Sequence, residues 1–159
     1  MSVNDGSPKG PVEVVVVGFH RDFDFARMDV ASAAVRGGAR LLASNDDATY
    51  PTSAGPIPGG GAILAGIERA SGARAVVAGK PYGPMIEHLR SRCGPHGIVV
   101  GDRPDTDGQL AVGLGYPFAL VLSGVTIDAG GLDPAPDEVA ATLAALVGGR
   151  TLCSGDGTE

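Results

Sequence analysis

Three aspartates crowd a short segment in the second half of the chain, directly after an apolar run. Residues 98–100 read Ile-Val-Val and predict a buried strand, and Gly101 lets the backbone leave the sheet. Asp102, Asp105 and Asp107 then follow within one loop. Ligands of open α/β sheets bind at this carboxyl end of the strands, and Mg²⁺ is bound there by one or two carboxylates with waters and a substrate phosphate. The spacing alone fits a magnesium site and a solvated acidic turn equally well.

The composition limits the classes of protein that the chain can belong to. It has 159 residues, of which 43% are hydrophobic, enough to build the core of one domain or of one domain with a small lobe. The net charge of −6 argues against a nucleic-acid partner or an anionic membrane surface, because both require clustered Lys and Arg. An anionic substrate must therefore be met by local positive charge or by a metal ion.

The cysteines and the N-terminal segment predict a cytoplasmic protein. Cys93 and Cys153 have neither the spacing of a disulfide framework nor that of a zinc site. The first eleven residues are polar and lack the apolar core of a secretion signal, and no apolar run is long enough to span a bilayer. We expect residues 1–11 to form a flexible leader and residues 150–159 a frayed tail.

Strands and helices alternate along the chain, a pattern typical of an α/β protein with a parallel sheet. A long loop rich in Asn, Asp, Pro and Gly occupies residues 44–61, and loops of this length are often functional. The predicted strands are 12–17, 41–43, 73–78, 98–100 and 118–122, and the predicted helices are 28–35, 62–70, 84–92, 110–114 and 134–146.

Lys80 stands at the end of the predicted strand 73–78, between Gly79 and Pro81. The Gly-Lys pair does not begin a nucleotide-binding P-loop, because Pro81 occupies the position where Ser or Thr must bind Mg²⁺. A lone surface lysine is usually solvated. One at a strand end, just before the acidic strand in the sequence, can instead pair with a carboxylate or a phosphate.

An EF-hand calcium loop is excluded at the acidic segment. Aligning its aspartates with the EF-hand pattern places Arg103 at the first ligand position and Leu114 at the last, and neither side chain can bind calcium.

Taken together, these motifs resemble the haloacid dehalogenase (HAD) superfamily, in the branch of nitrophenylphosphatases, phosphoglycolate phosphatases and glycerol-3-phosphate phosphatases. The resemblance extends over residues 12–146. It implies a partial Rossmann-like HAD core at 73–149 and part of an α/β cap domain at 12–72. The matching segments begin with the Val-Val-Gly that precedes the loop at residues 21–23. They continue, in sequence order, with residues 43–51, 58–61, 79–81 and 101–107.

The resemblance also implies roles for single residues. In this family Mg²⁺ neutralises charge on a phosphate that an aspartate attacks. Lys80 matches the catalytic lysine, Asp102 the direct metal ligand, and Asp107 the supporting acidic residue of the metal site. Asp105 falls at a variable motif position. Substrate-binding contacts with a small phosphorylated metabolite are implied for Arg21, Asn45 and Asp47.

The family's nucleophile motif, Asp-x-Asp-Gly after an apolar strand, does not occur upstream of Lys80. Asp22 and Asp24 have the spacing, but Phe25 follows them in place of glycine. His20 is a second departure, because relatives usually carry aspartate there. We therefore expect the C-terminal portion of a Mg²⁺-dependent phosphatase, inactive alone. The absent half would leave a strand edge unpaired, so we expect a homo-oligomer, a partner chain that supplies the nucleophile half, or a protein that is poorly stable alone.

A function of another class, other than an enzyme, also fits the sequence. The chain would then be a non-catalytic binding or interaction module, in which Asp102, Asp107 and Lys80 persist as a metal or phosphate site or as a salt-bridged loop. Metal affinity without phosphatase activity would favour this module over a subunit of a split enzyme.

Overall fold

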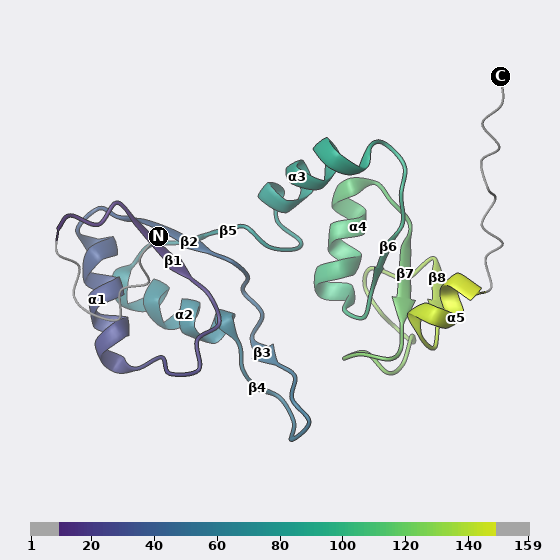
Figure 1. Cartoon of the computed structure of the whole chain (residues 1–159), viewed down its shortest axis with the longest axis horizontal. Coiled ribbons are helices and arrows are strands. Elements are labelled where there is room, and N and C mark those ends of the chain that lie inside the picture. Colours follow the sequence, from purple (N-terminus) through teal and green to yellow (C-terminus); the bar gives the residue numbers. More distant parts are fainter. Residues whose placement is uncertain (1–9, 149–159) are drawn as a thin grey trace. The chain divides into compact units, whose positions relative to one another are not determined.

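The computed structural model describes residues 10–148, which form two compact units (Figure 1). Each unit contains a three-stranded parallel sheet with helices, so the predicted α/β class is confirmed. The division falls between Met85 and Ile86, later than the expected boundary after residue 72. The assignment of the units to cap and core stays a prediction. The predicted tail and the first nine residues of the predicted leader lie outside the described residues.

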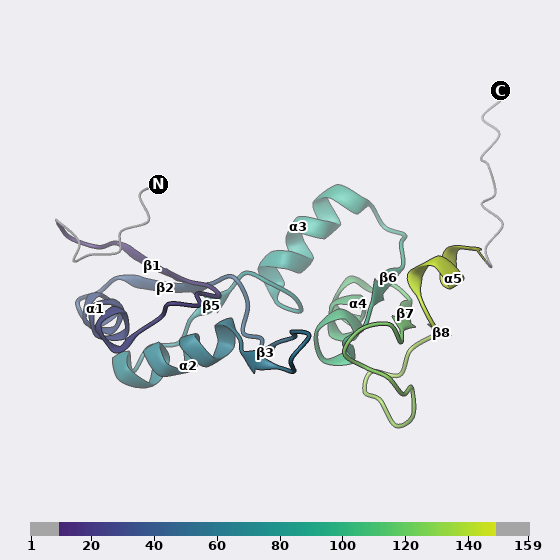
Figure 2. The same cartoon turned by 60° about the horizontal axis from the view of Figure 1, so that its bottom comes forward.

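The first unit is built on strands β1 (Val14–Val17), β2 (Arg40–Ala43) and β5 (Val76–Val77), in the order β1-β2-β5. Helices α1 (Phe25–Arg36) and α2 (Gly60–Ser71) pack on one face of this sheet (Figure 2). The buried core between helices and sheet consists of Val17, Val35, Leu41, Ala43, Leu64 and Ile67. Because the three strands are parallel, the loops that follow them lie at one edge of the sheet.

The long loop at 44–61 contains a small hairpin that the sequence did not predict. Strand β3 (Thr49–Tyr50) pairs antiparallel with β4 (Ile57–Pro58). Two residues per strand are too few to show an alternating hydrophobic pattern, so only the pairing between the strands reveals the hairpin.

The second unit contains α3 (Gly83–Cys93) from Ile86 onward and a sheet in the order β6-β7-β8. Its strands are β6 (Val99–Gly101), β7 (Phe118–Val121) and β8 (Glu138–Ala140), and its other helices are α4 (Gln109–Leu114) and α5 (Leu143–Gly148). A π-helical turn, η1 (Pro104–Gly108), leads from β6 into α4. Ala111, Phe118 and Leu120 form the buried core. Within the described chain, β6 is an edge strand.

The helix predicted over 134–146 is wrong. Its middle is strand β8, which pairs parallel with β7 so that Val139 lies opposite Leu120, and only its end is helical, in α5. Asp137 anchors this pairing, because its amide donates to the Phe118 carbonyl at 2.9 Å and its Oδ2 accepts from the Phe118 amide at 2.8 Å. These contacts with a distant strand outweigh a local helical preference.

Neither a long apolar helix nor a three-residue metal cluster occurs in residues 10–148. None of the helices there is long and apolar enough to cross a membrane. No group of three or more His, Cys, Asp or Glu side chains could hold a metal ion by itself. Cys93 is exposed and reduced, and Cys153 lies outside the described residues.

Ser32 is a buried polar side chain in the middle of α1. It is 1% exposed, and its hydroxyl finds no hydrogen-bond partner in the described part of the chain. We expect Ser32→Ala to raise the free energy of unfolding by about 1 kcal/mol, because it removes an unsatisfied buried hydroxyl and improves helix propensity. Urea unfolding followed by circular dichroism measures the change.

Ser71→Ala is the matched control for this substitution, because the Ser71 hydroxyl donates to the Glu68 carbonyl and accepts from the Ala73 amide. The control should not stabilise the protein. A loss of stability in Ser32→Ala would show that the buried hydroxyl is satisfied.

Candidate functional site

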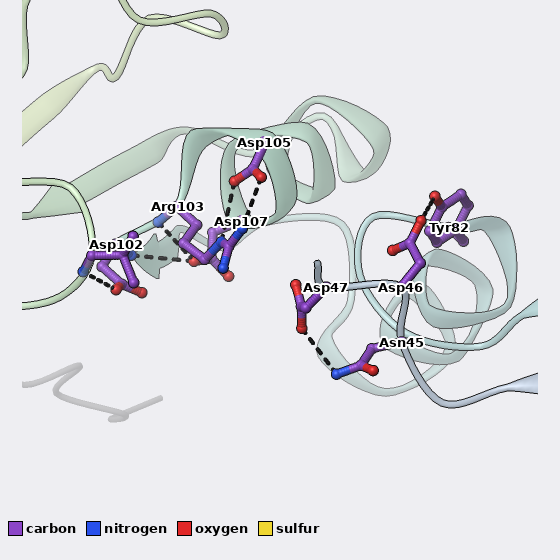
Figure 3. Close-up of polar contacts among 9 residues, drawn as sticks. Asn45, Asp46, Asp47, Tyr82, Asp102, Arg103, Asp105 and Asp107 are labelled. Carbon is purple, nitrogen blue, oxygen red and sulfur yellow. Dashed lines mark hydrogen bonds and ion pairs between the residues drawn. The ribbon is translucent and has the colours of Figure 1, made fainter. Parts of the chain in front are cut away.

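The carboxylate of Asp107 is buried directly under the end of β6. Asp107 is 4% exposed. Its Oδ2 accepts hydrogen bonds from the backbone amides of Asp102 and Arg103, both at 3.2 Å (Figure 3). Gly101 makes room for it, since a Cβ at this position would lie 2.2 Å from Asp107 Cγ. Asp107 therefore holds the backbone that carries Asp102.

Asp102 is the partly exposed carboxylate at the end of β6. Its Oδ2 accepts a hydrogen bond from the Val125 amide at 2.6 Å, in the loop after β7. Gly124 allows this approach, because a Cβ there would lie 2.0 Å from Asp102 Oδ2. The Thr126 amide also donates to the Asp102 carbonyl at 3.3 Å. The loop after β7 thus fixes Asp102 from the neighbouring strand.

Asp105 is turned into a local ion pair. Arg103 Nη2 lies 3.0 Å from Asp105 Oδ2, and Arg103 Nε donates to Oδ1 at 3.3 Å. The hydrogen bonds from Arg103 lower the pKa of Asp105 below its usual value, although partial burial opposes this shift. Its side chain is 66% exposed. Asp105 therefore remains charged and forms an ion pair with Arg103 of the same loop.

The donor set at β6 fits part of a magnesium site. Mg²⁺ usually takes one or two carboxylates and keeps several waters, so a cluster of three protein ligands is not required. Asp102 is partly exposed, and of its two carboxylate oxygens only Oδ2 accepts a hydrogen bond from the described residues. Asp102 can thus offer an oxygen to a cation, while Asp107 uses an oxygen to hold the loop.

In the first unit, Lys80 lies in a turn that follows β5. The Ala78 amide donates to the Ala43 carbonyl at 2.8 Å, and the Tyr82 amide donates to the Gly79 carbonyl at 3.0 Å. Lys80 thus follows a strand as predicted, but β5 is shorter than the predicted strand 73–78 and Lys80 lies in the turn beyond its end.

Asn45 and Asp47 lie in the loop after β2, at the same edge of this sheet. Asn45 Nδ2 donates to Asp47 Oδ2 at 2.9 Å, whereas the buried Asn45 Oδ1 has no partner in the described part of the chain. The Gly61 amide donates to the Asp47 carbonyl at 2.9 Å, which seats the loop on the N-terminus of α2.

Arg21 is an exposed residue in the loop after β1. The loops of this sheet edge therefore carry Arg21, Asn45, Asp47 and Lys80 in the first unit, whereas Asp102 and Asp107 belong to the second.

Two contacts at this edge of the sheet were not predicted from the sequence. The rings of Phe19 and Tyr50 stack with centroids 4.7 Å apart, and the Tyr82 hydroxyl donates to Asp46 Oδ2 (Figure 3). Each pair joins residues that are distant in the sequence, and no local periodicity marks such a pairing.

Comparisons with known proteins identify the family. Residues 77–146, the segment with Lys80, Asp102 and Asp107, match the model of the HAD-hydrolase-like family. The chain is also 35% identical, over 120 residues, to the dihydroxyacetone phosphatase of Corynebacterium glutamicum, covering 74% of this chain and 44% of that protein. The chain belongs to the HAD-like hydrolases.

Solved structures of HAD-like phosphatases share the fold. The p-nitrophenyl phosphatase from Archaeoglobus fulgidus is 33% identical with a TM-score of 0.75, over 87% of this chain and 57% of that one. The glycerol phosphate phosphatase from Mycobacterium tuberculosis, solved in complex with magnesium, is 34% identical with a TM-score of 0.74, over 84% and 42%. The chain thus spans between 42% and 57% of the length of these HAD-like relatives.

Proposed function

We propose that the chain supplies magnesium- and phosphate-binding groups of a HAD-like phosphomonoesterase that acts on small phosphorylated metabolites in the cytoplasm. Asp102 is the direct Mg²⁺ ligand, and Asp107 positions it through the backbone of residues 102 and 103. Lys80 binds the phosphate group. Arg21, Asn45 and Asp47 contact the rest of the substrate. The relatives support this substrate class, since the similar proteins include a dihydroxyacetone phosphatase and a glycerol phosphate phosphatase.

The arrangement of Asp102 over Asp107 carries this proposal. A buried carboxylate that accepts two backbone amides is a costly feature, and here it holds a second carboxylate at the carboxyl end of a parallel strand. When bound, Mg²⁺ would neutralise negative charge on the phosphate oxygens. Lys80 would supply local positive charge for a phosphate group, which a chain with a net charge of −6 does not attract by its overall charge.

Metal binding tests the proposal directly. Mn²⁺, used as a paramagnetic stand-in for Mg²⁺, should broaden the amide NMR signals of residues 102–108 and Val125 in the purified 159-residue chain. In Asp102→Asn this broadening should need at least about tenfold more metal, because the direct ligand loses its charge. Asp105→Asn, in the same loop, should bind Mn²⁺ like the wild type. Equal binding in all three proteins would contradict the assignment of Asp102.

Hydrolysis tests the inferred need for a nucleophile. We infer that the 159-residue chain hydrolyses nitrophenyl phosphate with Mg²⁺ no faster than Asp102→Asn, because no Asp-x-Asp-Gly motif lies upstream of Lys80. Activity that Asp102→Asn abolishes would mean that the chain or its homo-oligomer contains a nucleophile.

Complementation separates a split or partial enzyme from a binding module. Adding the N-terminal half of the C. glutamicum relative as a separate partner chain should produce turnover if this chain belongs to a phosphatase. Metal binding with no turnover in that mixture would favour the non-catalytic module.

A further inference from the structure

The turn that carries Lys80 lies against the loop after β2. The hydrogen bond from the Ala78 amide to the Ala43 carbonyl keeps the two chain segments together one residue beyond β5. A Cβ at position 79 would lie 2.4 Å from the Ser44 carbonyl oxygen, so only glycine allows this approach. The backbone contact at Gly79 therefore fixes the entry to the turn.

A side-chain contact fixes the other end of the turn. The Tyr82 amide donates to the Gly79 carbonyl at 3.0 Å, which places Lys80 and Pro81 in the two central positions. The hydroxyl of Tyr82 reaches back to the loop after β2 and donates to Asp46 Oδ2 (Figure 3). Both ends of the segment that carries Lys80 are thus attached to the same loop.

We propose that Tyr82 and Asp46 form a positioning pair that holds the Lys80 turn in place for phosphate binding. The inference rests on the phosphate-binding role proposed above for Lys80. A lysine side chain is long and flexible, and ordering it on binding costs conformational entropy. A backbone that is already fixed leaves only the side chain to be ordered, so the pair should raise phosphate affinity without touching phosphate.

The ionisation of Tyr82 provides a spectroscopic signature of the pair. The hydrogen bond to Asp46, with smaller contributions from burial and from the charges of Asp46 and Glu68, raises the pKa of Tyr82 to about 12. The folded protein thus holds this proton more tightly than the unfolded chain, where the pKa is about 10. The resulting stabilisation is complete below about pH 10 and is lost as the pH rises through 12.

An absorbance titration of the protein should therefore show a late tyrosine ionisation that belongs to Tyr82. It should disappear in Tyr82→Phe and move toward pH 10 in Asp46→Ala. An unchanged titration curve in Asp46→Ala would show that the hydrogen bond does not exist in solution and would overturn the proposal.

Backbone dynamics test whether the pair orders the turn. In ¹⁵N relaxation measurements, the order parameter of the Lys80 amide should fall from about 0.85 to below about 0.6 in Tyr82→Phe and Asp46→Ala. Asp46→Asn keeps an acceptor oxygen and should retain most of the order. Tyr116→Phe is the matched control, because the Tyr116 hydroxyl donates to the Gly94 carbonyl in the other unit. An order parameter that Tyr82→Phe leaves unchanged would overturn the proposal.

Inorganic phosphate tests whether the pair acts through Lys80. Phosphate binding is measured from the amide chemical shifts of the turn. Tyr82→Phe should weaken this binding about three- to tenfold. In a Lys80→Ala background the same substitution should have no further effect, whereas a general structural role would weaken binding in both backgrounds. If the wild type binds no phosphate, the phosphate role of Lys80 fails. The pair would then be judged by the relaxation data, and an order loss confined to the Lys80 turn would support it.

Discussion

Asp107→Ala is expected to lower the free energy of unfolding of the second unit by about 3 kcal/mol. The substitution removes a buried carboxylate that accepts two backbone amides, and hydrogen bonds to a charged group contribute about 1.5 to 3 kcal/mol each. The amides of Asp102 and Arg103 would be left without this acceptor. Urea unfolding followed by the amide NMR signals of β6 and β7 measures the effect on this unit.

The matched control lies two residues earlier in the same loop. Asp105→Ala removes an ion pair with Arg103 whose carboxylate is mostly exposed, and exposed ion pairs contribute about 1 kcal/mol or less. Its unfolding free energy should therefore stay within about 1 kcal/mol of the wild type. Equal losses in the two variants would contradict the different roles assigned to these aspartates.

Gly61→Ala is expected to destabilise the first unit by about 3 kcal/mol or more. A Cβ at this position would lie 2.0 Å from the Asp46 carbonyl oxygen and 2.8 Å from that of Asp47, and both are backbone atoms that cannot rotate away. The loop after β2 would have to leave the N-terminus of α2. The amide signals of α2 in urea, and the loss of late tyrosine ionisation, measure this displacement.

Gly66→Ala, in the same helix, separates this clash from a general effect of alanine. Its Cβ would meet only the end of the Met28 side chain, with Sδ at 3.1 Å, and a flexible thioether can move. Alanine also has a higher helix propensity than glycine by about 1 kcal/mol. We expect Gly66→Ala to match or exceed wild-type stability. A comparable loss in both variants would mean that the loop does not sit on α2 as described.

The sequence predicted the parts of the fold that depend on local pattern. The apolar runs before Gly18 and Gly101 became strands β1 and β6, and the predicted helices at 62–70 and 84–92 became α2 and α3. Periodicity and terminating glycines are properties of neighbouring residues, so they can be read without the tertiary structure. The order of family motifs likewise identified the HAD-like hydrolases before any contact was known.

The tertiary structure alone decided where β8 begins and which aspartate is buried. Asp105 and Asp107 have the same chemistry and lie two residues apart, yet one is exposed beside Arg103 and the other holds the backbone under β6. The π-helical turn η1 separates them by directing one side chain outward and the other inward. The bond from Tyr82 to Asp46 spans 36 residues and arises only because β2 and β5 are neighbours. Contacts of this kind depend on which segments become adjacent in space, and that adjacency is set by packing of the whole sheet rather than by the residues next to them in sequence.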